Sequence, residues 1–209
     1  SKNVSATQKN NSDEGAIHFA AASGNLELTR YLVDSAKVDP TEKTKDGETA
    51  LHWAARSGSL EVLKYLIFDK KLDVNSKTVK ILESPLHWAS KFGKLDVVAF
   101  LIDTVQMDPT IKNSEGQTAL HLAAKTGHTE LVQYLITKKN VDPTSVDNLG
   151  NTILHLAAEN AHLELAKYLV SKINLDIART NSEKLKPLDI AKRSEKKEMV
   201  AYFESLTKK

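Results

Sequence analysis

Thr49-Ala-Leu-His-Trp-Ala-Ala55 is the stretch that decides the fold, because close copies of it recur along the chain. Each copy has a histidine at its centre, and these histidines are His18, His52, His87, His121 and His155. They are separated by 34, 35, 34 and 34 residues. A fixed period of this length predicts that one supersecondary unit is copied end to end.

The residues that flank the histidines also repeat. The other four copies are Gly15-Ala-Ile-His-Phe-Ala-Ala21, Ser84-Pro-Leu-His-Trp-Ala-Ser90, Thr118-Ala-Leu-His-Leu-Ala-Ala124 and Thr152-Ile-Leu-His-Leu-Ala-Ala158. A sixth copy is eroded and reads Lys186-Pro-Leu-Asp-Ile-Ala-Lys192. An aromatic ladder in the same register consists of Tyr31, Tyr65, Phe100, Tyr134, Tyr168 and Tyr202. Copies that agree at this many positions exclude chance as the explanation.

The motif resembles the ankyrin repeat, whose signature is Thr-Pro-Leu-His-x-Ala in a unit of about 33 residues made of a turn and two helices. The resemblance implies an all-α solenoid of stacked helix-turn-helix units with projecting turns. It covers a single repeat domain at residues 13–203, between a polar N-terminal tail (1–12) and a basic C-terminal tail (206–209). The expected repeats lie at about residues 13–45, 46–80, 81–114, 115–148, 149–182 and 183–205, the last being an eroded capping repeat.

The second copy shows why each unit should form two helices. Thr49 is a good N-cap, and small residues such as Ala54 let neighbouring backbones approach closely. Gly58 can end this helix in a left-handed conformation. The next apolar residues have helical spacing and are Leu60, Val62, Leu63, Leu66 and Ile67. A unit with one apolar stripe must bury it against its neighbours, so we expect the stack itself to be the core.

Composition limits the classes of function. The net charge of +2 is too small to indicate nucleic-acid binding, and no run of about 18 apolar residues indicates a membrane span. The chain has no cysteine, which excludes disulfides and thiolate metal sites and is typical of a cytoplasmic or nuclear protein. We therefore expect a monomer whose partner is another protein rather than a nucleic acid or a membrane.

The histidine ladder invites a metal or catalytic interpretation, but geometry argues against it. Stacked helices lie about 10 Å apart, whereas bonds to zinc are about 2 Å long, so the ladder histidines cannot share one ion. The resemblance implies instead that each imidazole bonds the threonine of its own motif and the backbone of the adjoining turn. The sequence also lacks the motifs of phosphate-binding loops, zinc proteases and serine or cysteine nucleophiles. We expect no metal, no cofactor and no enzymatic activity.

Function is expected where the copies differ, which the resemblance places at the turn tips and the exposed ends of the first helices. The third copy departs most from the others. Its turn has one additional residue, and Leu82 stands where a glycine is expected. Phe92 occupies the exposed end of the first helix. Two interpretations stay open: the turn folds down and buries Ile81 and Leu82, or these residues form an apolar anchor for a partner.

Trp53 and Trp88 follow the histidine in adjacent copies, in a slot that is apolar in every copy. Packing is the default interpretation, and partial exposure on the concave face would make them anchors. The predicted binding surface is centred on the second to fourth copies. Its residues are Lys45, Asp46, Glu48, Trp53, Arg56, Ile81, Leu82, Trp88, Lys91, Phe92, Glu115 and Lys125.

Asn75 is a candidate for modification. It ends Leu72-Asp-Val-Asn75, which resembles the turn in which ankyrin repeats can be hydroxylated on asparagine. Its alternative role is to hydrogen-bond its own turn.

Together these observations predict a protein–protein interaction module or adaptor that uses its concave face and turn tips. Two alternatives remain open. One is a targeting or regulatory segment of a larger enzyme or effector. The other is a stand-alone assembly chaperone, because the repeat number resembles that of the ankyrin-type proteasome chaperone.

Overall fold

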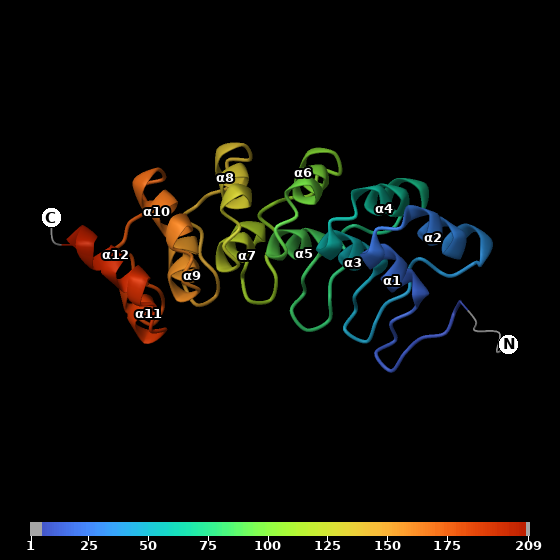
Figure 1. The fold of residues 1–209 in the computed structure, drawn as a ribbon, viewed down its shortest axis with the longest axis horizontal. Coiled ribbons are helices and arrows are strands. Elements are labelled where there is room, and N and C mark those ends of the chain that lie inside the picture. Colours follow the sequence, from blue (N-terminus) through green and yellow to red (C-terminus); the bar gives the residue numbers. More distant parts are fainter. Residues whose placement is uncertain (1–5, 208–209) are drawn as a thin grey trace. The chain divides into compact units, whose positions relative to one another are not determined.

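The computed structural model describes residues 6–207, and its helices are labelled in Figure 1. The chain divides into two compact units, residues 1–108 and residues 109–209. Apart from an isolated bridge between Lys9 and Gly15, the regular structure of the described residues is helical. The expected all-α repeat solenoid is confirmed.

The first unit is built from pairs of antiparallel helices. The first helices of the pairs are α1 (Ala16–Ser23), α3 (Ala50–Ser57) and α5 (Pro85–Lys91). The second helices are α2 (Leu26–Arg30), α4 (Leu60–Lys64) and α6 (Leu95–Asp103). Helices α2 and α4 continue into the π-helical turns η1 (Tyr31–Ser35) and η2 (Tyr65–Asp69). Helix α3 packs against both α1 and α5, so the first helices form one layer of the stack.

The second unit repeats this plan. Its first helices are α7 (Ala119–Lys125), α9 (Ile153–Glu159) and α11 (Pro187–Arg193). Its second helices are α8 (Thr129–Thr137), α10 (Leu163–Ser171) and α12 (Lys197–Thr207). Helix α12 therefore includes the start of the expected basic tail (206–209). Residues 208–209 of that tail, and residues 1–5 of the expected N-terminal tail, lie outside the described part of the chain.

The residues predicted to bound the first helices do so. Thr49 precedes α3 in extended conformation, and Gly58 follows it with a φ of 86°. Later copies use a residue with a side chain in the same left-handed slot, Ala161 (φ 62°) and Glu195 (φ 56°). A Cβ atom is unfavourable in this conformation, so these two helix ends are held by their surroundings rather than by local preference.

The core of each unit combines alanines of the first helices with branched residues of the second. Ala54 is fully buried, as are Val62, Leu63 and Leu66 of the predicted stripe. The last turn of the second helix differs from expectation, because the N–H of Lys70 donates to the carbonyl oxygen five residues earlier (3.1 Å). This wider turn is a π-helical bulge at the end of an otherwise regular helix.

Residues 10–14 form a turn that belongs to the first copy. The N–H of Asn10 donates to O of Glu14 (3.1 Å), and the side-chain oxygen of Asn10 accepts from the N–H of Glu14 (3.0 Å). Thr44 and Glu48 make the same two bonds in the second copy, at 3.0 and 3.2 Å. The repeat pattern thus begins before the motif that marks it in the sequence.

Candidate functional site

The ladder histidines cap their own helices, and His52 and His155 also bond the backbone of the next copy. The N–H of Thr49 donates to Nδ1 of His52 (3.2 Å), and Nε2 of His52 lies 3.0 Å from O of Glu83 in the following turn. Because Nδ1 accepts a hydrogen bond, Nε2 carries the proton and donates to this carbonyl. The structural role that the resemblance implies is confirmed.

In the second unit His155 makes the same link, and His121 bonds an earlier carbonyl of the loop that follows it. Nε2 of His121 lies 3.2 Å from O of Ser145, and Nε2 of His155 lies 3.2 Å from O of Leu185. Burial lowers the pKa of both imidazoles, because desolvation disfavours the charged form. Burial also lowers the pKa of His52, to about 4. The neutral imidazole is therefore the form that the folded chain stabilises.

The first and last copies keep the helix cap with different chemistry. The N–H of Gly15 donates to Nδ1 of His18 (3.1 Å), and the N–H of Lys186 donates to Oδ2 of Asp189 (2.9 Å). Nε2 of His18 is buried and has no hydrogen-bond partner among the described residues. The eroded copy therefore retains the capping half of the motif.

The projecting turns share one hydrogen-bond pattern, which locates the additional residue of the third copy. The N–H of Thr44 donates to O of Glu48 (3.0 Å), four residues later. In the third copy the N–H of Thr78 donates to O of Glu83 (3.0 Å), five residues later. The third turn thus encloses one residue more than the second turn, as the sequence predicts.

The third turn does not fold down on its neighbours. The side chains of Ile81 and Leu82 are 36% and 42% exposed, and Val79 is also exposed. Leu82 has a φ of 56°, in the slot where Gly47 has a φ of 77°. The interpretation in which the turn buries Ile81 and Leu82 itself is therefore wrong.

A groove of about 250 Å³ lies between the second turn, the third turn and α5. It is lined by Asp46, Glu48, Thr78, Lys80, Ile81, Glu83, Trp88 and Lys91. The N–H of Val79 donates to O of Asp46 (2.8 Å), so the two turns are joined along one wall. Within the groove, Nζ of Lys80 lies 3.1 Å from Asp46, and Nζ of Lys91 lies 3.6 Å from the buried carboxylate of Glu83.

The two tryptophans have different environments. Nε1 of Trp53, which is half-buried, donates to Oε2 of Glu48 (2.9 Å). Trp88 is only 8% exposed, and its buried Nε1 has no hydrogen-bond partner among the described residues. An unsatisfied buried donor of this kind costs about 1–3 kcal/mol. Trp88 therefore lines the groove as a buried side chain, whereas the exposed apolar side chains are those of Ile81 and Leu82 in the third turn.

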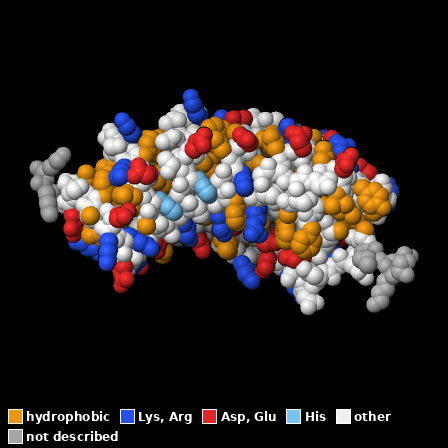
Figure 2. Space-filling view, viewed as in Figure 1, with side chains coloured by type: hydrophobic (Ala, Val, Ile, Leu, Met, Phe, Trp, Pro, Cys, Tyr) orange, Lys and Arg blue, Asp and Glu red, His pale blue; other side chains and the backbone are white. Residues whose placement is uncertain are grey.

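Aromatic side chains follow the first helices of this unit. Phe92, at the end of α5, is 37% exposed, and the guanidinium carbon of Arg56 lies 4.9 Å from its ring centroid. The rings of Phe19 and Trp53 lie 5.4 Å apart, centroid to centroid. Figure 2 shows hydrophobic side chains at the surface over α1 and its neighbours. The first unit therefore presents an apolar strip beside its groove.

The structure brings together five of the twelve predicted binding residues in this groove. Those that line it are Asp46, Glu48, Ile81, Trp88 and Lys91. Those elsewhere in the first unit are Lys45, Trp53, Arg56, Leu82 and Phe92. Sequence reasoning missed Thr78, Lys80 and Glu83. Of these, Glu83 has a usable signal, because it stands 35 residues after Glu48 in the same slot.

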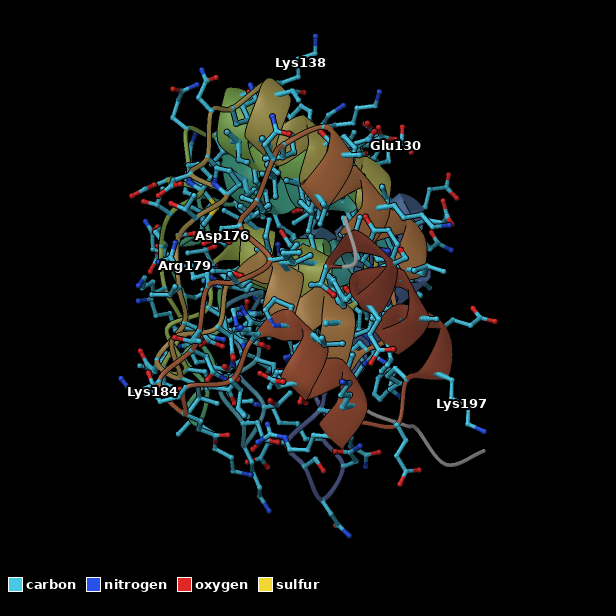
Figure 3. The ribbon with its side chains drawn as sticks, turned by 90° about the vertical axis from the view of Figure 1, so that its left-hand side faces the viewer. Glu130, Lys138, Asp176, Arg179, Lys184 and Lys197 are labelled. Carbon is cyan, nitrogen blue, oxygen red and sulfur yellow. The ribbon has the colours of Figure 1, made fainter. Side chains whose placement is uncertain are left out.

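Glu115 and Lys125, the other two predicted residues, line a separate groove of about 470 Å³ in the second unit. Other residues of this groove are Asp147, Leu149, His155, Glu159, Glu183 and Arg193. Arg193 pairs with Glu183 (2.6 Å), and Leu149 is 60% exposed at a turn tip. Figure 3 shows Lys184 at the tip of the last turn, on the side opposite Lys197 at the start of α12.

Asn75 is exposed in the turn that precedes the third copy. Its N–H donates to Oδ1 of Asp73 (2.9 Å), so this position takes part in the hydrogen bonding of its own turn. The amide side chain is accessible, and hydroxylation of Asn75 stays a prediction.

The fold defines a class of protein, a solenoid of helical repeats with projecting turns. The chain belongs to the ankyrin-repeat family, because the family model for three ankyrin repeats matches residues 2–78, 80–147 and 139–205. Ankyrin repeats are generally protein–protein interaction modules. No curated protein matches the chain. Residues 6–207 contain no group of acidic and histidine side chains that could hold a metal ion, and no helix long and apolar enough to cross a membrane.

Proposed function

We propose that this protein binds another protein through the groove of the first unit, with the third turn as its apolar anchor. The observation that carries the proposal is the exposure of Ile81 and Leu82 at the tip of a projecting turn. The corresponding tip of the second copy is polar, with Lys45 and Asp46. Apolar side chains on such a tip are unfavourable in water, and a partner that covers them removes this penalty.

The backbone of the third turn supports the same proposal. Leu82 occupies a left-handed slot that glycine fills at Gly47, Gly116 and Gly150, and that Asp13 and Lys184 fill in the first and last copies. Glycine adopts this conformation without a steric penalty, whereas leucine does not. Strain of this kind is often found at functional sites, where a side chain is needed despite its local cost.

The surroundings of the anchor have the composition of an interface. The Lys80–Asp46 pair lies at the exposed edge of the groove. Arg56, stacked on Phe92, adds a cation with a large apolar contact surface. An apolar centre with a polar rim is the usual anatomy of a protein–protein interface, and aromatic and arginine side chains are enriched there.

The test uses peptides selected on the wild-type protein from a displayed random-peptide library. Changing Ile81→Ser and Leu82→Ser together should weaken binding of the selected peptides by at least about 2 kcal/mol, roughly 30-fold. The melting temperature should hardly change, because both side chains are already exposed in the free protein. Affinity is measured by calorimetry and stability by thermal unfolding.

The matched control is Glu159→Ala with Asn160→Ala at the exposed end of α9 in the second unit. These changes should leave binding and melting unchanged. The proposal fails if peptide affinity survives the serine substitutions, or if those substitutions unfold the protein.

A further inference from the structure

We propose that the groove of the first unit receives an extended segment of a protein partner, and that a backbone carbonyl oxygen of this segment accepts a hydrogen bond from Nε1 of Trp88. This inference rests on the proposed function of the same groove. It adds the chemistry by which the groove recognises the segment, namely a neutral acceptor that reaches the groove floor.

The donor is a buried side chain of the groove. Trp88 lines the groove, is 8% exposed, and has an Nε1 atom without a hydrogen-bond partner among the described residues. Trp53 stands in the same slot 35 residues earlier, and its Nε1 donates to Glu48 (2.9 Å). The second copy therefore satisfies its indole internally, whereas the third copy presents an indole N–H that still requires an acceptor.

An exchange of partners between the two copies explains the difference. The carboxylate of Glu83, which is equivalent to Glu48, lies 3.6 Å from the ammonium group of Lys91. The residue of the second copy equivalent to Lys91 is Arg56, which lies over the ring of Phe92. Because Arg56 stacks on Phe92, the carboxylate of Glu48 is available to accept from the indole of Trp53. In the third copy the carboxylate of Glu83 pairs with Lys91 instead of accepting from Trp88.

The charges of the groove favour a neutral acceptor. Three carboxylates line it, those of Asp46, Glu48 and Glu83, against two ammonium groups. An anionic acceptor would be repelled by the carboxylates, whereas a backbone carbonyl would not. An extended segment also directs alternate side chains to opposite faces, so an apolar side chain can contact Ile81 while a neighbouring carbonyl reaches Trp88. Because Nε1 is buried, side chains around it must shift on binding, as interface side chains commonly do.

Two-dimensional ¹H–¹⁵N NMR tests the donor directly. The chain has two tryptophans, so its indole region contains two signals, which Trp53→Phe and Trp88→Phe assign. In the free protein the Trp53 signal should lie at the shift of a hydrogen-bonded indole, and the Trp88 signal should lie upfield of it. Adding a peptide whose binding depends on Ile81 should move the Trp88 signal downfield and leave the Trp53 signal in place.

Affinity provides the second readout. Trp88→Phe should weaken binding of the same peptide about tenfold, because the bound carbonyl loses its donor. Trp53→Phe should weaken binding less than Trp88→Phe does, and should lower stability because it breaks the bond to Glu48. Replacing Trp88 by 3-benzothienylalanine, which has sulfur in place of the N–H and keeps the ring size, should reproduce the loss of affinity.

Each outcome separates this inference from the proposed function. Equal indole shifts for the two tryptophans in the free protein would show that Trp88 already has an acceptor, and would overturn the inference. A peptide that depends on Ile81 but leaves the Trp88 signal unmoved overturns it too, while the proposed function stands. If no such peptide is found, the proposed function fails, and titration with N-methylacetamide, a plain amide carbonyl, tests the donor alone. A Trp88 signal that does not move in that titration then overturns the inference.

Discussion

The two units share one repeat but expose different surfaces. Among the described residues, eight of the nine exposed large apolar side chains belong to the first unit, and one, Leu149, belongs to the second. The second unit nevertheless has the larger groove, about 470 Å³ against about 250 Å³. Groove volume and exposed apolar side chains are therefore distributed differently between the two units. The chemistry of the surface, rather than its volume, therefore distinguishes the candidate site.

Each unit is stabilised internally by the same kind of hydrogen bond, from a buried imidazole to a backbone carbonyl of the loop that follows. This link occurs at His52 in the first unit and at His121 and His155 in the second. Changes to this link should therefore affect stability in either unit. Changes to the third turn should affect binding in the first unit alone.

Acid should produce the largest effect, because it acts on the feature that the units share. The pKa of His52 is lowered from 6.5 to about 4, so the unfolded chain binds more protons than the folded chain between these values. Stability is fully present above pH 6.5 and falls as the pH is lowered toward 4, by about 3 kcal/mol for His52 alone. Protonation of Nδ1 also places a donor against the N–H of Thr49. Urea unfolding at several pH values measures the slope.

A glutamine variant provides the control for the acid experiment. His52→Gln keeps a donor and an acceptor but does not titrate, so the variant should lose less stability than the wild type between pH 6.5 and pH 4. Identical slopes for the two proteins would refute the assignment of this pH dependence to His52.

The second largest effect is expected for a buried histidine of the second unit, compared with a groove-lining residue of the same helix. His121→Ala should destabilise the protein by about 1–3 kcal/mol, because it leaves the buried Thr118 and the part-buried carbonyl of Ser145 without these hydrogen bonds. Lys125→Ala, four residues later on the groove side of the same helix, should be nearly silent. Chemical denaturation measures both variants. Equal losses of stability would break the distinction between the buried link and the groove surface.

The smallest effect is a gain of stability. Leu82→Gly restores the residue type that fits the left-handed slot, and should stabilise the protein by about 1 kcal/mol. The same change removes an exposed apolar side chain and should weaken binding of the selected peptides. Thermal unfolding measures the stability of this variant, and calorimetry measures its affinity for the selected peptides. A variant with lower stability would indicate that Leu82 packs within the fold.

The sequence was sufficient to predict the repeat because the requirements of stacking recur at a fixed period. Thr49 and His52 cap the start of α3, and Gly58 ends it. Later copies have residues at the equivalent positions. The first turn, at residues 10–14, escaped prediction because it carries no glycine and no repeat signature. The π-helical ends of α2 and α4 also escaped, since nothing in their residue pattern differs from that of a regular helix.

The site was predictable only in part. The insertion and the missing glycine of the third turn are visible as breaks in the period, but the sequence left open whether Ile81 and Leu82 are exposed or buried. The state of Trp88 depends on whether Glu83 bonds the indole or Lys91, and the repeat register does not encode this choice. A period identifies equivalent positions, but it cannot say which of two neighbours each side chain will take as its partner.

The link from the imidazoles of His52 and His155 to the following turn also gives the array a direction. The carbonyl oxygen of Glu83 accepts hydrogen bonds from Thr78 and His52. Removing the copy that precedes His52 would leave both of these bonds in place. Removing the copy that follows His155 would take away one acceptor of Nε2, O of Leu185. Asp189 resolves this asymmetry, because a carboxylate caps its own helix and has no second N–H to leave unpaired. The substitution that looks like erosion in the sequence therefore keeps the helix cap and removes the donor that such a link requires.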